Sequence, residues 1–475
     1  MTAISLSRSA PLSRFLLPQN RPALVWVALV IAYFAVQFTL RLHSAAGLEF
    51  DEAEALWYAR SLQFGYNAQP PLYFWLQNLV FHLPLAPLTA LALLKTMIFA
   101  AAVLAIFAIF RQIDTKAAPA AMLSLGLLPE VVWEMQRDRT HTVLLLLLAA
   151  FGMLRILQSQ QKHRETGGET GGASLGAILG LGLLSKPNFG FFALGLLVAS
   201  RRVLRRPTAS QILLAAAVAL GIAAPWLIWA MTHPDLAGSS LHKLALAAEN
   251  PFRRRLTGLG NFALALLAML GLAALVLGPI WARVRPGPIT QDGARIILQT
   301  AFASVLLFLL AVLVSGASQT QSRWLLPMVF LLPPVVTLHL HQRMSPASAK
   351  RMTACLALPW LVVLIALPLA NRTATRQMDF AALDATLPQG MATASTQTLL
   401  LGNLVNLGTD RPLYLLAKGA AAPASGTDVL LLDTEAGLAF ARTLGYGLSK
   451  DSLRSLTVID GTRTRPLWTA IATAP

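Results

Sequence analysis

The sequence predicts an all-α protein of about eleven transmembrane helices, followed by a small C-terminal α/β domain. Hydrophobic residues make up 56% of the 475 positions and charged residues only 12%, against about 45–50% and about 25% in soluble domains. Long apolar stretches recur up to Ala370, after which the composition becomes that of a soluble protein. These observations divide the chain into a membrane domain, residues 1–370, and a soluble domain, residues 371–475.

Each transmembrane helix is predicted from a run of apolar residues. A span needs about 20 of them, because the hydrocarbon core contains no water to satisfy free backbone N–H and C=O groups. The two runs on either side of Ser185 are the shortest. The predicted spans are Leu24–Leu40, Leu85–Phe110, Ala118–Trp133, Val143–Leu157, Ala173–Leu184, Phe189–Ser200, Ile212–Met231, Phe262–Trp281, Ile296–Ser315, Leu325–Leu340 and Met352–Ala370.

The net charge of +17 would suit a nucleic-acid-binding protein, but the positions of the basic residues argue against that class. They cluster in every second loop, starting with the N-terminal tail, and such loops face the cytoplasm under the positive-inside rule. An odd number of spans then places the C-terminal domain on the periplasmic face of the cell inner membrane. The clustered residues are Arg8, Arg14, Arg21, Arg111, Lys116, Lys162, Arg164, Arg201, Arg202, Arg205, Arg206, Arg283, Arg285, Arg295, Arg343, Lys350 and Arg351.

The first outer loop, residues 41–84, is too long for a simple connection between two spans. Asp51–Phe64 and Pro71–Leu83 each have the pattern of a short amphipathic helix, and the second is rich in aromatic residues that suit the membrane interface. We therefore expect a platform lying on the outer leaflet. The other outer loops are predicted at Pro129–His141, Ser185–Asn188, Thr232–Gly260 and Gly316–Arg323.

The C-terminal domain is predicted from short runs of strand-forming residues around one helix. The helix is expected at Glu435–Leu444, and the alternation of short strands with a helix favours a small α/β domain of about 100 residues. The strands are expected at Thr398–Leu401, Val429–Asp433, Ser455–Asp460 and Leu467–Ala472.

Four acidic residues, Glu49, Asp51, Glu52 and Glu54, follow the first predicted span. Acidic residues at a membrane surface are commonly solvated loop charges, which is the alternative interpretation of Glu49 and Glu54. Asp51 and Glu52 open a helix at the level where a lipid phosphate would lie. A carboxylate in that place could take the proton of an acceptor hydroxyl, or Asp51 and Glu52 could together hold a divalent metal ion.

The segment DEAEALWYARSLQFGYNAQPPLYFWL, Asp51–Leu76, resembles the first outer loop of the bacterial family related to dolichyl-phosphate-mannose protein mannosyltransferases, which includes the aminoarabinose transferases of lipid A. The similarity covers most of Leu24–Leu340. It implies a GT-C fold and a glycosyltransferase that takes sugar from a polyprenyl-phosphate donor. The acceptor would be a glycolipid, lipopolysaccharide or protein. Weaker similarities occur at Arg139–Thr142, Leu184–Pro187, Ala224–Trp226 and Arg323–Pro327.

The resemblance also implies roles for individual residues. Asp51 would be the catalytic carboxylate, with Glu52 as its neighbour or metal co-ligand, and Tyr73 belongs to the Pro-Pro-Leu-Tyr stretch at the substrate. Two positions depart from the family. Gln69 stands where aminoarabinose-type members have lysine, and Thr142 stands where many members have an aspartate. Asp138, four residues before Thr142, is the candidate replacement for that second acid.

A phosphate donor requires cations, and a basic residue near the membrane surface is costly unless it meets an anion. Lys186 lies in the bend between the two shortest predicted spans, and Arg323 opens a later one. Both are candidate phosphate ligands, although a snorkelling lysine is the alternative for Lys186. Arg254 lies in an Arg253–Arg255 run, for which contact with lipid headgroups competes with a contact to the carrier phosphate.

Two other classes of protein share some of these features. A transporter or lipid flippase would also have many spans, but it would place ionisable residues within them and commonly contain repeated, broken helices. Most acids of this chain lie in predicted loops, and no repeat is visible. A non-catalytic scaffold would leave the Asp51–Glu52 platform unexplained. The sequence therefore favours a glycosyltransferase over both alternatives.

Overall fold

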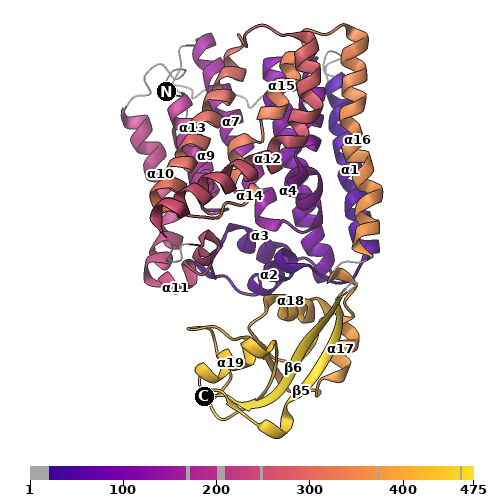
Figure 1. Ribbon diagram of the computed structural model, residues 1–475, viewed down its shortest axis with the longest axis vertical. Coiled ribbons are helices and arrows are strands. Elements are labelled where there is room, and N and C mark those ends of the chain that lie inside the picture. Colours follow the sequence, from indigo (N-terminus) through magenta and orange to yellow (C-terminus); the bar gives the residue numbers. More distant parts are fainter. Residues whose placement is uncertain (1–20, 167–171, 201–208, 246–249, 373–374, 461–462) are drawn as a thin grey trace, which may run out of the picture.

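The computed structural model describes residues 21–166, 172–200, 209–245, 250–372, 375–460 and 463–475. Of the basic residues predicted to face the cytoplasm, Arg8, Arg14 and those within 201–206 lie outside these ranges. A bundle of long helices forms most of the molecule, and a domain that contains a sheet lies at one end of it (Figure 1). The first helix, α1, begins at the far end of the bundle and ends beside this domain.

Among the described residues, seven helices are long and apolar enough to cross a membrane. A pair that bends by 46°, α14 (Ser322–Val329) and α15 (Leu332–His341), forms an eighth if it is one broken span. The fold is therefore that of a polytopic α-helical membrane protein, as the sequence predicts. The seven helices are α1 (Arg21–Ser44), α4 (Pro87–Ile113), α7 (Thr140–Thr166), α10 (Ala209–Thr232), α12 (Pro251–Val284), α13 (Asp292–Ser315) and α16 (Pro346–Asn371).

Three predicted spans fall on shorter elements. The helices α8 (Gly172–Leu183) and α9 (Phe189–Ser200) have 12 residues each, which cover about 18 Å at about 1.5 Å per residue. The prediction of one helix over Ala118–Trp133 is wrong. That stretch is broken before Pro129, because a residue that precedes proline is pushed toward extended backbone, and Leu128 has φ −98° and ψ 110°. The pieces are α5 (Ala118–Leu123), η3 (Ser124–Leu127), the π-helical turn η4 (Glu130–Glu134) and α6 (Met135–Arg137).

Close backbone packing holds α8 against α10. A Cβ atom built on Gly176 would lie 2.3 Å from the carbonyl oxygen of Ala215, so only glycine allows this approach. Small residues are common where membrane helices touch, because lipid provides no hydrophobic force between apolar helices and close contact must replace it. The most enclosed span is α7, with 78% of its apolar window buried, whereas α10 has 6%. The core of the bundle therefore lies around α4 and α7.

The predicted first outer loop forms a layer across the end of the bundle (Figure 1). Its helices are α2 (Phe50–Tyr58) and α3 (Leu72–Phe81). The second agrees with the predicted Pro71–Leu83, but the first ends six residues before the predicted Phe64. The small elements on the same side are α11 (Pro234–Ala237) and η5 (Leu241–Leu244).

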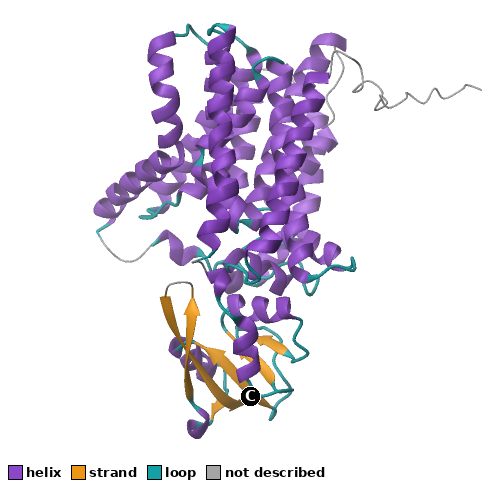
Figure 2. Cartoon of the chain, turned by 90° about the vertical axis from the view of Figure 1, so that its right-hand side faces the viewer, coloured by secondary structure: helices purple, strands orange, loops and turns teal. Residues whose placement is uncertain are grey.

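The C-terminal domain contains a mixed six-stranded sheet with the strand order β2-β1-β3-β6-β4, and β5 pairs with β6. The strands β1, β2 and β3 are parallel, while β6 runs antiparallel to its neighbours (Figure 2). The elements are η6 (Thr375–Gln377), α17 (Phe380–Thr386), β1 (Ala392–Ser395), α18 (Thr398–Leu407), β2 (Leu413–Leu415), β3 (Asp428–Asp433), α19 (Glu435–Thr443), β4 (Gly447–Leu448), η7 (Lys450–Ser452), β5 (Arg454–Asp460) and β6 (Arg463–Thr473).

The strand predicted at Thr398–Leu401 is wrong, because these residues begin helix α18. Leu400, Leu401 and Leu404 lie on one buried face at helical spacing, and the helix ends at Gly408 with φ +72°. A short leucine run fits a strand or a buried helix equally well, and its pattern alone does not separate them. The other three predicted strands coincide with β3, β5 and β6, and the predicted helix with α19.

Candidate active site

The acidic cluster lies at the start of α2, at the end of the bundle that faces the C-terminal domain. Glu49 caps the helix and forms a capping box with Glu52, whose side chain accepts from the Glu49 backbone N–H at 3.4 Å. Acidic residues in the first turn are stabilised by the positive end of the helix dipole. The local sequence therefore favours both the helix and the fixed placement of Asp51 within its first turn.

Asp51 and Glu52 face different surroundings, because consecutive helical residues differ by about 100° in direction. The Asp51 side chain is 19% exposed and pairs with Arg139 at 3.4 Å. The Glu52 side chain is 2% exposed and contacts three cations: Arg376 at 2.9 Å, Arg41 at 3.0 Å and Lys95 at 3.5 Å. Asp51 is therefore the accessible carboxylate of the pair, and Glu52 is the enclosed one.

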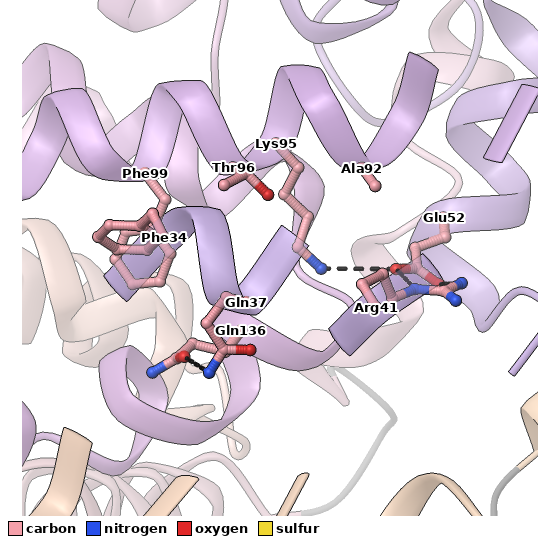
Figure 3. A pocket seen from close by; sticks show the side chains of 9 residues that line it. All are labelled: Phe34, Gln37, Arg41, Glu52, Ala92, Lys95, Thr96, Phe99 and Gln136. Carbon is pink, nitrogen blue, oxygen red and sulfur yellow. Dashed lines mark hydrogen bonds and ion pairs between the residues drawn. The ribbon is translucent and has the colours of Figure 1, made fainter. Parts of the chain in front are cut away.

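Figure 3 shows Lys95 of α4 and Arg41 of α1 converging on Glu52. Burial alone would raise the pKa of Glu52, but the charges of Arg376, Arg41 and Lys95 outweigh it and hold that pKa well below its usual range. Beside them lies a cavity of about 30 Å³, also lined by Gln37 and Gln136, which has room for a water molecule. Glu52 is thus an ionised structural centre that joins three helices to the C-terminal segment.

This arrangement does not suit a metal ion shared by Asp51 and Glu52. Both carboxylates already face cations, and they point to different sides of α2. No group of three or more His, Cys, Asp or Glu side chains in the described part of the chain is placed to hold a metal ion. We therefore derive no catalytic step from a metal at this pair.

Arg139 joins Asp51 to a second group of acids. Its guanidinium lies 3.2 Å from Glu134, 3.7 Å from Glu130 and 3.7 Å from Asp138. Burial raises the pKa of the Asp138 carboxyl, and the charge of Asp51 raises it further. The structure thus brings Asp138, the candidate second acid, close enough to Asp51 for the two charges to interact.

Lys186 lies in the bend between α8 and α9, which is tied to its surroundings on both sides. The backbone N–H of Leu72 donates to Leu184 O at 3.1 Å, and Asn188 donates to Trp324 O at 2.9 Å. The Lys186 ammonium donates to Thr142 Oγ1 at 2.7 Å. Burial lowers the pKa of Lys186 to about 8. The charge of Arg323 also lowers this pKa, whereas the charge of Asp51 raises it. Lys186 and Arg323 therefore lie in the same electrostatic surroundings as Asp51.

The remaining predicted site residues are placed as follows. The Tyr73 ring is fully buried, 5.2 Å from the His141 ring, and its hydroxyl has no hydrogen-bond partner among the described atoms. Gln69 donates its backbone N–H to the Asn67 side chain. Arg254 lies in the first turn of α12 and packs beside Gly316, where a built Cβ would lie 2.6 Å from its Nη2.

Glu54 is buried and accepts a hydrogen bond from Asn67 at 2.7 Å. It is therefore not the solvated loop charge of the alternative interpretation. Burial raises its pKa to about 7, and the charge of Asp51 contributes in the same direction. Helical residues three apart lie on the same face. The two carboxyls therefore share one side of α2.

Sequence reasoning did not select Arg41, Lys95 or Arg376, the three partners of Glu52. Lys95 had a usable signal, because an ionisable residue inside an apolar span commonly marks a functional site. Arg41 ends the first span and is ambiguous, since basic residues at helix ends often snorkel. Arg376 lies in the segment that leads to the C-terminal domain, and no local pattern distinguishes it.

Comparison with known proteins confirms the resemblance. The family model described as dolichyl-phosphate-mannose-protein mannosyltransferase matches residues 68–229. Two relatives from Rhizobium johnstonii are named lipopolysaccharide core galacturonosyltransferases: RgtB is 31% identical over 66% of this chain and 65% of its own length, and RgtA is 29% identical over 64% and 62%. The chain thus spans slightly less than two thirds of either relative.

The fold agrees with that of a solved structure. ArnT from Cupriavidus metallidurans, in a crystal structure bound to undecaprenyl phosphate, aligns with a TM-score of 0.62 over 94% of this chain and 98% of ArnT. The identity is 15%, so this likeness concerns the fold. It extends over both the bundle and the C-terminal domain.

Proposed function

Because the chain has the GT-C fold and resembles the bacterial mannosyltransferase-related family, we propose that it is an integral-membrane glycosyltransferase. It moves a sugar from a polyprenyl-phosphate donor to an acceptor in the cell envelope. The site faces the periplasm, with the N-terminus in the cytoplasm. The basic loops of the sequence support this orientation, as does the start of α1 at the end of the bundle opposite the C-terminal domain.

The observation that carries the proposal is the grouping of the accessible Asp51 with Lys186 and Arg323. These residues come from α2, the α8–α9 bend and α14, and the charges of Asp51 and Arg323 both act on Lys186. Transfer from a lipid phosphate requires one group that accepts a proton and cations that meet the phosphate. The grouping provides both at the end of the bundle, where a lipid headgroup would lie.

The proposed reaction is a single displacement with inversion. The acceptor hydroxyl oxygen bonds to the anomeric carbon, and the bond from that carbon to the phosphate oxygen breaks. Asp51 takes the hydroxyl proton, and the polyprenyl phosphate leaves with the electron pair of the broken bond. Lys186 and Arg323 stabilise the charge that moves onto the phosphate, since charge-assisted hydrogen bonds are about twice as strong as neutral ones.

Other residues have supporting roles in this proposal. Arg139 orients Asp51, and Asp138 in turn holds Arg139 from the buried side. Glu52 fixes α2 through its cations and does not contact the substrate. Tyr73 is a candidate contact for the sugar, while Arg254 lies beside Gly316 and is assigned to lipid headgroups.

The relatives favour one acceptor class. Both are named for transfer of galacturonic acid to the lipopolysaccharide core, so we propose lipopolysaccharide or a related glycolipid as the acceptor, ahead of a protein. Galacturonic acid is the first sugar to test. The transferase names of the relatives also favour transfer over the alternative of a transporter or flippase.

Reconstituted transfer tests this function. The purified full-length chain in lipid nanodiscs would receive undecaprenyl-phosphate-linked galacturonic acid or a neutral hexose, with lipopolysaccharide from a deletion strain as the acceptor. Mass spectrometry should show the acceptor gaining one sugar mass and free undecaprenyl phosphate accumulating in equal amount. A deletion strain whose envelope glycolipids and glycoproteins match those of the parent would contradict the proposal.

A further inference from the structure

The buried contacts around Glu52 also define a role for the segment that joins the bundle to the C-terminal domain. We propose that Arg376 is a positioning residue for sugar transfer, which fixes Asp51 and Arg139 relative to each other. This inference rests on the proposed function. It assigns a catalytic purpose to the C-terminal segment, which lies outside the region of sequence resemblance.

The Arg376 side chain is fully buried between two walls of the site, namely helix α2, which carries Asp51, and the segment 137–139, which carries Arg139. Its Nη2 lies 2.9 Å from Glu52 Oε1 and also donates to the carbonyl oxygen of Arg137. Glu52 directly follows Asp51, and Arg137 precedes Asp138 and Arg139. One guanidinium therefore contacts both the helix that holds the proposed base and the segment that orients it.

Lys95 bridges the same two groups from the membrane side, at 2.7 Å from Arg137 O and 3.5 Å from Glu52. Lys95 sits on the long helix α4, so this contact is anchored within the bundle (Figure 3). Arg376 is different, because it belongs to η6, at the entrance to the C-terminal domain. The alignment of the two walls therefore depends on how that domain is docked.

The docking is specific. The Gly47 N–H donates to the Arg376 carbonyl at 3.2 Å, and a Cβ on Gly47 would lie 2.5 Å from that oxygen. Asn403 of α18 accepts from Leu48 N at 2.8 Å and donates to Leu48 O at 3.2 Å. These contacts hold Gly47 and Leu48, the two residues that directly precede Glu49, the N-cap residue of α2. The C-terminal domain is thus hydrogen-bonded to the segment that leads into α2, the helix that carries Asp51.

Transfer kinetics of Arg376→Gln, in the full-length protein in nanodiscs, test the inference. The neutral, shorter amide removes the charge and the forked geometry of the guanidinium. A displacement of about 1 Å at a reacting group can cost about 10²-fold in rate, so we expect kcat to fall by about that factor. The KM for the lipid-linked sugar should change by less than about threefold, because Lys186 and Arg323 are untouched.

Arg411→Gln is the matched control. Arg411 is also buried, but it pairs with Asp384 at 2.9 Å inside the C-terminal domain. Its replacement removes a buried ion pair within that domain but leaves the contacts with Gly47, Leu48 and Glu52 in place, so kcat should not fall. In an Asp51→Asn background, Arg376→Gln should cause little further loss, since it acts through Asp51. Equal losses in the Arg376 and Arg411 variants, or an undiminished loss in the Asp51→Asn background, would overturn the proposal.

Hydrogen exchange gives a reading that does not depend on catalysis. Exchange of the backbone amides of residues 50–58 and 135–139 should increase in Arg376→Gln and not in Arg411→Gln. If Arg376→Gln does not fold, Asn403→Ala should increase exchange in residues 50–58 in the same way. Unchanged exchange in these segments in a folded variant would refute the positioning role. Absence of transfer by the wild-type protein would refute only the proposed function.

Discussion

Replacing Asp51 by asparagine removes the proposed base while keeping the size of the side chain and its hydrogen bonds. Loss of a general base slows a reaction by about 10²–10⁴-fold, equivalent to about 2.7–5.4 kcal/mol in the activation barrier at 1.36 kcal/mol per decade. The fold should tolerate the change. Asp51 is 19% exposed and its ion pair with Arg139 spans 3.4 Å, and such partly solvated pairs contribute about 0–1 kcal/mol to stability.

The structure also supplies a control for the loss of charge beside Arg139. Glu134 pairs with the same guanidinium at 3.2 Å and is 31% exposed, so Glu134→Gln removes a comparable ion pair without removing a base. In nanodiscs with a polyprenyl-phosphate sugar, Asp51→Asn should lose kcat by the factor above, and Glu134→Gln should keep it within about threefold. Binding of undecaprenyl phosphate should persist in both variants, because Lys186 and Arg323 remain. Turnover at the wild-type rate in folded Asp51→Asn would refute the assignment of the base.

Four further expectations follow from the charges of the site and from the topology of the bundle. Lys186→Ala should raise the KM for the lipid-linked sugar by about 10–100-fold, because a hydrogen bond to a charged group contributes about 1.5–3 kcal/mol. Arg323→Ala should raise the KM as well. Unchanged steady-state kinetics in either variant would contradict its contact with the phosphate. Because burial lowers the pKa of Lys186 to about 8, donor affinity should decline as the pH rises through 8, and Lys186→Arg should move that decline to higher pH. Burial raises the pKa of Glu54 to about 7, so the folded state binds more protons than the unfolded state between about pH 4.5 and 7. The stability of the protein should therefore fall with rising pH across that window. Thermal unfolding of Glu54→Gln should lack this fall, and a pH profile identical to that of the wild type would show that Glu54 is solvated. Alkaline phosphatase fused after Gly402 should be active and after Gly287 inactive, and the reverse pattern would invert the proposed topology.

The sequence predicts the class of the fold because membrane insertion depends on local composition. Each long span lies on a run of apolar residues that no soluble helix would expose, and Val314, at 81% exposure, illustrates a side chain that needs lipid around it. Failures occur where an apolar run has more than one solution. Ala118–Trp133 breaks at Pro129, and Thr398–Leu401 folds as helix because its leucines find a buried face in the C-terminal domain.

The site was predictable in part. The family resemblance points to Asp51 and to Asp138, and a position near the membrane surface points to Lys186 and Arg323. In the structure the charge of Asp51 acts on both Asp138 and Lys186, and that of Arg323 acts on Lys186. Their catalytic roles stay predictions. Arg254 lies in the first turn of α12 and packs beside Gly316, and its role also stays a prediction.

The sequence by itself determined that this chain is a polytopic membrane protein, that an Asp-Glu pair follows its first span, and which family that region resembles. Those features depend on residues that are neighbours in the chain. Only the tertiary structure decided that Glu52 is enclosed by Arg41, Lys95 and Arg376 while Asp51 stays accessible. The C-terminal domain grips the start of α2 through Leu48 and Asn403, 355 positions apart in the chain. Such contacts form only when whole elements pack against each other, because no local pattern brings these residues together. The same holds for Glu52, since a buried charge is stable only when it is paired.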